Sequence, residues 1–137
     1  MISFSRVRTG ACRVPESEPT RETTLNRTAT AHPPASNELP IGTIHGGWQA
    51  TLLDSCMACA VQTELKAGQA FTSLEIKVNF LRALTDKAGP VRAEGRVIQD
   101  GRQIGIAEGS LYDAAGKLYA HGTTTCLIFD HENLRRI

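Results

Sequence analysis

The longest apolar stretch of the chain covers residues 48–61, where apolar or small side chains fall on every side of a helical wheel. This pattern is typical of a helix that protein encloses on all sides. Lys66 and Gly68 follow the stretch, and they suit the negative end of the helix dipole and a left-handed cap. The pattern therefore predicts one long buried helix that stops near residues 66–68.

Alternating apolar and polar residues predict four strands after this helix, over residues 71–84, 91–99, 102–112 and 117–129. Asp100-Gly101 is a strong hairpin signal between the second and the third. In the first strand we expect a core face of Leu74, Ile76, Val78 and Phe80 and a polar face of Ser73, Glu75, Lys77 and Asn79. A weaker strand is predicted within residues 22–32, ahead of a loop over 33–44.

The predicted elements run in the order strand, loop, long helix and four strands joined by short turns. Hairpin-linked strands form antiparallel sheets, and a helix that is apolar all round is best buried when such a sheet curls around it. The prediction is an α+β domain with a curved antiparallel sheet wrapped around one long buried central helix. Because such a sheet leaves an outer face and unpaired edges, we expect at least a dimer.

At 137 residues the chain has the size of one domain, which we place at 22–130 between a flexible polar leader over 1–21 and a short charged tail over 131–137. A net charge of +1 without a basic stripe argues against nucleic acid as a partner. No apolar run reaches the length of a membrane span, and the N-terminus lacks the features of a secretory signal. We therefore expect a cytoplasmic protein with no membrane contact.

The four cysteines are Cys12, Cys56, Cys59 and Cys126. Cys56 and Cys59 form a C-x-x-C pair deep inside the predicted helix, whereas redox pairs lie at helix N-termini. Buried thiols that act as small apolar groups are the favoured interpretation. No metal site is predicted, because Cys126, His121 and His131 form no recognisable ligand pattern.

The candidate chemistry lies at His45-Gly46-Gly47, which opens the helix, and at Asp54 in its middle. Free N–H groups at a helix N-terminus can hold a carbonyl oxygen as it becomes an oxyanion. A carboxylate in partly dry surroundings can act as a general base or as a nucleophile at an acyl carbon. These groups indicate acyl transfer or hydrolysis, unless Asp54 only bonds a nearby backbone group or points out through a gap in the sheet.

The spacing of these groups adds a constraint. Gly46 or Gly47 lies seven or eight residues before Asp54, so their backbones are about 10 to 12 Å apart along one helix at ~1.5 Å rise per residue. One small acyl group cannot readily touch both. The amide is therefore expected from one subunit and the carboxylate from the other, across a dimer interface.

Several motifs together carry a family resemblance. They are G-T-I-H-G-G at 42–47, L-L-D at 52–54, T-S-L-E-I-K-V-N-F at 72–80, D-A-A-G-K-L at 113–118 and A-H-G at 120–122. Over about residues 22–129 the chain resembles the hotdog-fold acyl-CoA thioesterases of the phenylacetate-degradation and hydroxybenzoyl-CoA type. The resemblance implies homodimers that commonly pair into homotetramers. It also implies hydrolysis of an acyl-CoA thioester, with coenzyme A as part of the substrate and no further cofactor.

The resemblance also assigns roles to five positions. Asp54 matches the family's catalytic acid, and Gly46 or Gly47 matches the oxyanion-hole amide. Ser73 matches a residue that helps to place the lytic water in some members, although the alternation of its strand favours a solvated serine equally. His45 is expected to orient the loop rather than to transfer protons.

One position departs from the family pattern. Many relatives carry Asn or Gln six residues before the histidine of the H-G-G motif, and this chain has Leu39 there. Loss of that polar group leaves a non-catalytic acyl-CoA binder as an alternative function. A hotdog dehydratase fits less well, because the spacing of His45 and Asp54 does not match its motif, and an interaction protein with an incidental Asp54 is the remaining alternative.

Overall fold

The computed structural model describes residues 3–5 and 27–132. The single α-helix among them is α1 (Gly46–Glu64), and two short 3-10 helices occupy Ala35–Asn37 and Asp86–Ala88. The strands are β1 (Ser3–Ser5), β2 (Arg27–Ala31), β3 (Gln69–Phe80), β4 (Val91–Asp100), β5 (Ile104–Asp113) and β6 (Leu118–Asp130). Most of the predicted leader, Cys12 and most of the predicted tail lie outside the described residues. Within the leader segment, β1 is a short strand that pairs with β2.

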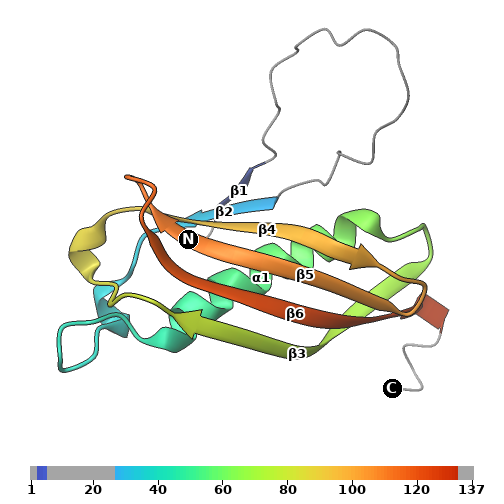
Figure 1. Ribbon diagram of the computed structural model, residues 1–137, viewed down its shortest axis with the longest axis horizontal. Helices are drawn as coiled ribbons and strands as arrows, with labels where there is room; N and C mark the ends of the chain where they lie inside the picture. Colours follow the sequence, from blue (N-terminus) through green and yellow to red (C-terminus); the bar gives the residue numbers. More distant parts are fainter. Residues whose placement is uncertain (1–2, 6–26, 133–137) are drawn as a thin grey trace, which may run out of the picture.

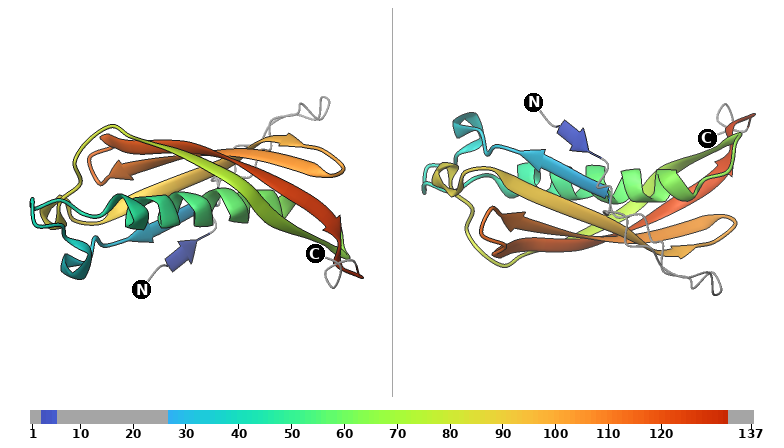
Figure 2. Two further views of the ribbon diagram at one scale, coloured as in Figure 1. Left: turned by 90° about the horizontal axis from the view of Figure 1, so that it is seen from below. Right: turned by 90° about the horizontal axis from the view of Figure 1, so that it is seen from above.

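The described strands form one antiparallel sheet in the order β1-β2-β4-β5-β6-β3. The helix lies along one face of this sheet (Figure 1), and the strands curve around it (Figure 2). Asp100-Gly101 joins β4 to β5 as a hairpin, as its sequence predicts, with the Gly101 N–H donating to the Ile104 carbonyl over 2.8 Å. The predicted α+β architecture is therefore confirmed.

The central helix begins where the sequence predicts and ends slightly earlier. His45 is the residue that caps its N-terminus, and the backbone is already extended at Leu65. Gly68 has a positive φ of 87°, but it lies in the turn that leads into β3. Its predicted role as the helix cap is therefore wrong, because the chain leaves the helix before reaching it.

One face of α1 forms the centre of the core. Its buried residues are Gln49, Leu52, Leu53, Cys56, Met57, Ala60 and Val61. Thr51 on the opposite face is exposed, and Ala58 is half-buried. The expectation that protein encloses the helix on all sides is therefore wrong for the single chain, because the sheet covers one side of it.

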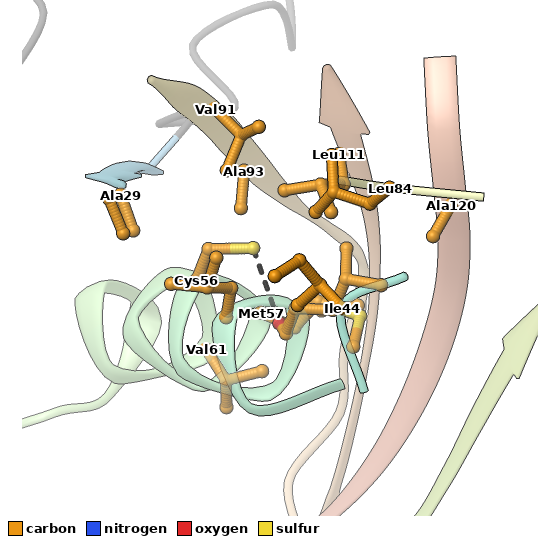
Figure 3. Close-up of a cluster of buried hydrophobic side chains, with 14 of the residues drawn as sticks. Ala29, Ile44, Cys56, Met57, Val61, Leu84, Val91, Ala93, Leu111 and Ala120 are labelled. Atoms are coloured by element: carbon orange, nitrogen blue, oxygen red, sulfur yellow. Dashed lines mark hydrogen bonds between the residues drawn. The ribbon is translucent and has the colours of Figure 1, made fainter. Parts of the chain in front are cut away.

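Figure 3 shows Cys56 and Met57 directed toward the strands that carry Ala93 and Leu111. The sheet approaches the helix closely at Gly109, where a Cβ atom would lie 2.9 Å from Met57 Cγ. Close packing of the sheet on the helix therefore explains this glycine.

Strand β3 differs from its predicted packing. The side chains of Leu74, Ile76 and Phe80 are 57%, 41% and 51% exposed, although the alternation predicts a core face. For Ile76 and Phe80 the reason is that β3 is the last strand of the described sheet, while α1 packs more closely on β4 and β5. The helix thus leaves much of the inner face of β3 uncovered. Leu74 is the residue at which the pairing of β3 with β6 is interrupted.

Candidate functional site

Asp54 lies half-buried on α1, beside an open hollow of about 380 Å³ between this helix and β3. The hollow is lined by Ala50, Thr51, Asp54, Ser73, Leu74, Glu75 and Ile76. The Oδ1 atom of Asp54 is buried and has no hydrogen-bond partner among the described residues. A structural bond from Oδ1 to the backbone therefore does not account for this carboxylate, and a buried unpaired carboxylate oxygen is costly.

Ser73 faces the helix, which corrects the predicted register. The pairing of β3 with β6 shifts between Ser73 and Glu75, so one extra residue is inserted into β3 at this point. A bulge of this kind exchanges the two faces of a strand. Ser73 consequently shares the inner face with Ile76, and its predicted place on the face of Glu75, Lys77 and Asn79 is wrong. The structure thus brings Ser73 and Asp54 to the same hollow.

Two buried side chains of β6, Cys126 and Thr124, lie behind Ser73. Cys126 was expected only as a buried thiol, and nothing in the sequence indicated a role for Thr124. The Sγ atom of Cys126 is 4.0 Å from both Ser73 Oγ and Thr124 Oγ1. Thr124 Oγ1 also donates a hydrogen bond of 2.8 Å to the carbonyl of Glu75. Burial raises the pKa of the Cys126 thiol above its ordinary value, so this thiol stays protonated. The alternation of residues along β6 could have predicted that Thr124 and Cys126 face inward. It does not indicate which residues of β3 they contact.

The N-terminus of α1 holds the other predicted site residues. The Nδ1 atom of His45 accepts a hydrogen bond of 2.8 Å from the Gly47 N–H, which supports its predicted orienting role. No hydrogen bond of the Gly46 N–H is found among the described residues. A Cβ atom on Gly46 would lie 3.0 Å from Phe80 Cζ, so the backbone of Gly46 is in close reach of β3. Of the two glycines, Gly46 thus has the amide that is open to a ligand.

The two halves of the site are not adjacent within one chain. Asp54 and Ser73 share the hollow, whereas His45, Gly46 and Gly47 lie at the start of the same helix. The continuous helix from Gly46 to Asp54 separates their backbones by about 12 Å. The predicted separation of amide and carboxylate is therefore present in the structure.

The cysteines on α1 are thiols without a catalytic environment. Cys56 is fully buried and its Sγ donates to the Leu53 carbonyl over 3.2 Å, as drawn in Figure 3. Burial raises the pKa of this thiol to about 12. Cys59 is partly buried and is also free. The predicted behaviour as small apolar groups is thus confirmed for Cys56.

A family model described as the thioesterase superfamily matches residues 41–120, a segment that includes all of α1. The chain belongs to this superfamily. Among curated proteins, SSO1253 of Saccharolobus solfataricus, which is named as a candidate esterase, is 33% identical over 92 residues. That match covers 67% of this chain and 59% of the relative, so the chain spans less than two thirds of its relative's length.

Solved structures of the superfamily share the fold of this chain. A Bacillus halodurans protein solved with CoA is 25% identical, with a TM-score of 0.69 over 74% of this chain and 66% of the other. A candidate thioesterase of Ralstonia eutropha JMP134, named as related to phenylacetic acid degradation, is 27% identical, with a TM-score of 0.69 over 74% and 75%. These likenesses confirm the expected hotdog thioesterase family. No helix among residues 27–132 is long and apolar enough to cross a membrane.

Proposed function

We propose that this protein is an acyl-CoA thioesterase whose active site combines residues of two subunits. The observation that carries the proposal is the buried Oδ1 of Asp54, which has no hydrogen-bond partner in the described part of the chain and lies at a hollow large enough for part of a small acyl chain. Membership of the thioesterase superfamily supports a thioester as the substrate. The B. halodurans relative, which was solved with CoA, supports coenzyme A as the thiol component.

Asp54 is the proposed chemical group. As a general base, its carboxylate takes a proton from water while the water oxygen bonds to the acyl carbon. The C–S bond then breaks, and CoA leaves as a thiolate that takes up a proton. As a nucleophile, the same carboxylate would attack the acyl carbon first, and water would release the acid in a second step. The first route requires the Asp54 carboxylate within reach of the attacking water, and the second requires it within reach of the acyl carbon.

The Gly46 N–H is the proposed donor to the developing oxyanion. It lies at the positive end of the α1 dipole, and it is not engaged by His45 as the Gly47 N–H is. The side chain of a larger residue would obstruct the approach of a substrate to this amide, which gives glycine a chemical reason at this position. Gly47 keeps the structural role of anchoring the His45 imidazole.

A second copy of the chain is proposed to supply the missing half of each site. Strand β3 is an edge strand of the described sheet, and its exposed Leu74 and Ile76 line the hollow beside Asp54. A partner that covers this face would bury these apolar side chains and complete the hollow. Two-fold symmetry would then place the helix N-terminus of one subunit near Asp54 of the other.

The test is the release of free thiol from a panel of aryl-CoA and medium-chain acyl-CoA thioesters. We expect turnover with at least one of them, and we expect Asp54→Asn to lower kcat by about 10²- to 10⁴-fold. Asn keeps the size of the side chain, and equal thermal unfolding of the two proteins would exclude a folding defect. An Asp54→Asn protein with unchanged kcat would refute the assigned role.

Non-catalytic binding of acyl-CoA is the second candidate function. The observation in its favour is Leu39, an aliphatic residue in the tight turn before α1, where its N–H donates to the Thr43 carbonyl over 2.7 Å. The resemblance to the family implies a polar side chain at this position. Saturable acyl-CoA binding in calorimetry, combined with no thiol release from any thioester of the panel, would favour this alternative.

A further inference from the structure

Thr124 and Cys126 form a buried chain of contacts that leads from the bulge of β3 to Ser73. Thr124 is 1% exposed and Cys126 is fully buried, and both project from β6 toward the helix side of the sheet. The contacts run from the Glu75 carbonyl to Thr124 Oγ1, then to Cys126 Sγ and finally to Ser73 Oγ. Neither Thr124 nor Cys126 lines the hollow itself.

The hydrogen bond from Thr124 to Glu75 decides which atom is the donor in the other two contacts. The carbonyl of Glu75 can only accept, so the Thr124 hydroxyl donates its single proton there. Thr124 Oγ1 can then only accept from the Cys126 S–H, and the Cys126 sulfur in turn accepts from the Ser73 O–H. The lone pairs of Ser73 Oγ are consequently the part of this hydroxyl that remains available to the hollow.

We propose that Thr124 and Cys126 are positioning residues that turn the Ser73 hydroxyl into a fixed hydrogen-bond acceptor for the lytic water. This inference rests on the proposed function and favours its general-base form. The water donates one O–H to Ser73 Oγ and the other to the Asp54 carboxylate. As the water oxygen bonds to the acyl carbon, Asp54 takes that proton and the C–S bond breaks.

Thr124 also holds the strand geometry that brings Ser73 inward. The ladder between β3 and β6 is interrupted between Ser73 and Glu75, and the Thr124 hydroxyl bonds the Glu75 carbonyl at this point. Without the inserted residue, Ser73 would lie on the solvent face together with Glu75 and Lys77. The same hydroxyl thus supports the bulge and orients the serine.

The kinetic test compares Thr124→Val, which removes the hydroxyl but keeps the shape, with Thr124→Ser, which keeps the hydroxyl. We expect Thr124→Val to lower kcat about five- to tenfold at a KM within about twofold of wild type, the size expected for one hydrogen bond, and Thr124→Ser to restore it. Thr125→Val, on the other face of β6, is the matched control. The double variant Thr124→Val with Ser73→Ala should show no larger decrease in kcat than Ser73→Ala alone. Additive losses would overturn the proposal.

A structural measurement separates this inference from the proposed function. Because Thr124→Val removes the hydrogen bond to the Glu75 carbonyl that supports the bulge, we expect Ser73 to turn away in a crystal structure of this variant, with loss of the contact between Ser73 Oγ and Cys126 Sγ. We expect this contact to persist in Thr125→Val. An unchanged Ser73 in Thr124→Val would overturn the inference even if Asp54→Asn abolished activity. Absence of thiol release from the wild-type protein would instead refute the proposed function, and the position of Ser73 in the variant would still decide the inference.

Discussion

The imidazole of His45 accepts a hydrogen bond of 2.8 Å from the backbone N–H of Gly47, two residues further along the chain. This bond satisfies one of the free amides at the start of α1 and fixes the loop that precedes it. It also distinguishes the two glycines of the H-G-G motif, because it leaves the Gly46 N–H as the open donor.

Replacement of His45 tests whether it only orients the loop. We expect His45→Ala to lower the free energy of unfolding by about 1 kcal/mol, because the cap acceptor is lost. His45→Asn retains a cap acceptor and should keep most of the stability and of the kcat. Urea denaturation and thiol release measure the two effects. If His45→Asn lost as much turnover as Asp54→Asn, His45 would have a chemical role that the structure does not provide.

Gly46→Pro removes the proposed oxyanion donor without disturbing the start of the helix. Proline is favoured at the first helical position, and His45 already has φ −56° and ψ 132°, a conformation that suits a residue before proline. We expect kcat to fall about 10²- to 10³-fold. Gly46→Ala is the control for crowding, since it keeps the N–H while its Cβ atom meets the half-exposed ring of Phe80, and we expect it to lose less kcat than Gly46→Pro. Equal losses in the two variants would indicate crowding rather than a lost donor.

Ile76→Lys tests whether the exposed inner face of β3 is a subunit interface. Ile76 is 41% exposed beside the hollow, and a lysine there would place a charge in the proposed contact. We expect monomers in sedimentation velocity and loss of thiol release. Ile98→Lys is the matched control, because Ile98 is 54% exposed on β4, away from β3. An Ile76→Lys protein that remained an active dimer would place the interface elsewhere.

The Cys56 thiol predicts how stability depends on alkaline pH. Burial raises its pKa to about 12 in the folded protein, from 9.0 as the ordinary value. Between these two pH values the Cys56 thiol is deprotonated in the unfolded chain but protonated in the folded protein. The free energy of unfolding therefore falls as the pH rises. The contribution is at most about 1.4 kcal/mol per pH unit, and it fades as the pH falls below 9. Urea denaturation from pH 7 to 10.5 should show a smaller decline for Cys56→Ala than for wild type, and parallel declines would contradict this prediction.

The helix and the sheet could be predicted because their signals are local. The apolar stretch over 48–61 has the all-round pattern of an enclosed helix, and Asp100-Gly101 specifies a hairpin by its turn chemistry. Asp54 could be singled out from the sequence because a carboxylate inside an apolar stretch is costly unless it has a partner or a function. The separation of Asp54 from Gly46, on which the proposed two-subunit site rests, could be anticipated from the length of helix between them.

The environment of Ser73 could not be predicted, because it depends on contacts between distant residues. Strict alternation places Ser73 with Glu75 and Lys77, and one inserted residue in β3 reverses this. The hydroxyl of Thr124, nearly fifty residues later, bonds the backbone at that bulge, so no local sequence pattern predicts it. The exposure of Phe80 likewise follows from where α1 lies on the sheet and not from the residue itself.

The claim that each site combines two subunits is tested most directly by mixing two inactive variants. Asp54→Asn lacks the carboxylate and Gly46→Pro lacks the amide, so neither homodimer has a complete site. After subunit exchange at equal concentrations, half of the dimers should be mixed, each with one intact and one doubly defective site. Thiol release should then recover to about a quarter of the wild-type rate per subunit. If the mixture stayed as inactive as its components although sedimentation or native mass spectrometry showed mixed dimers, the shared site would be refuted.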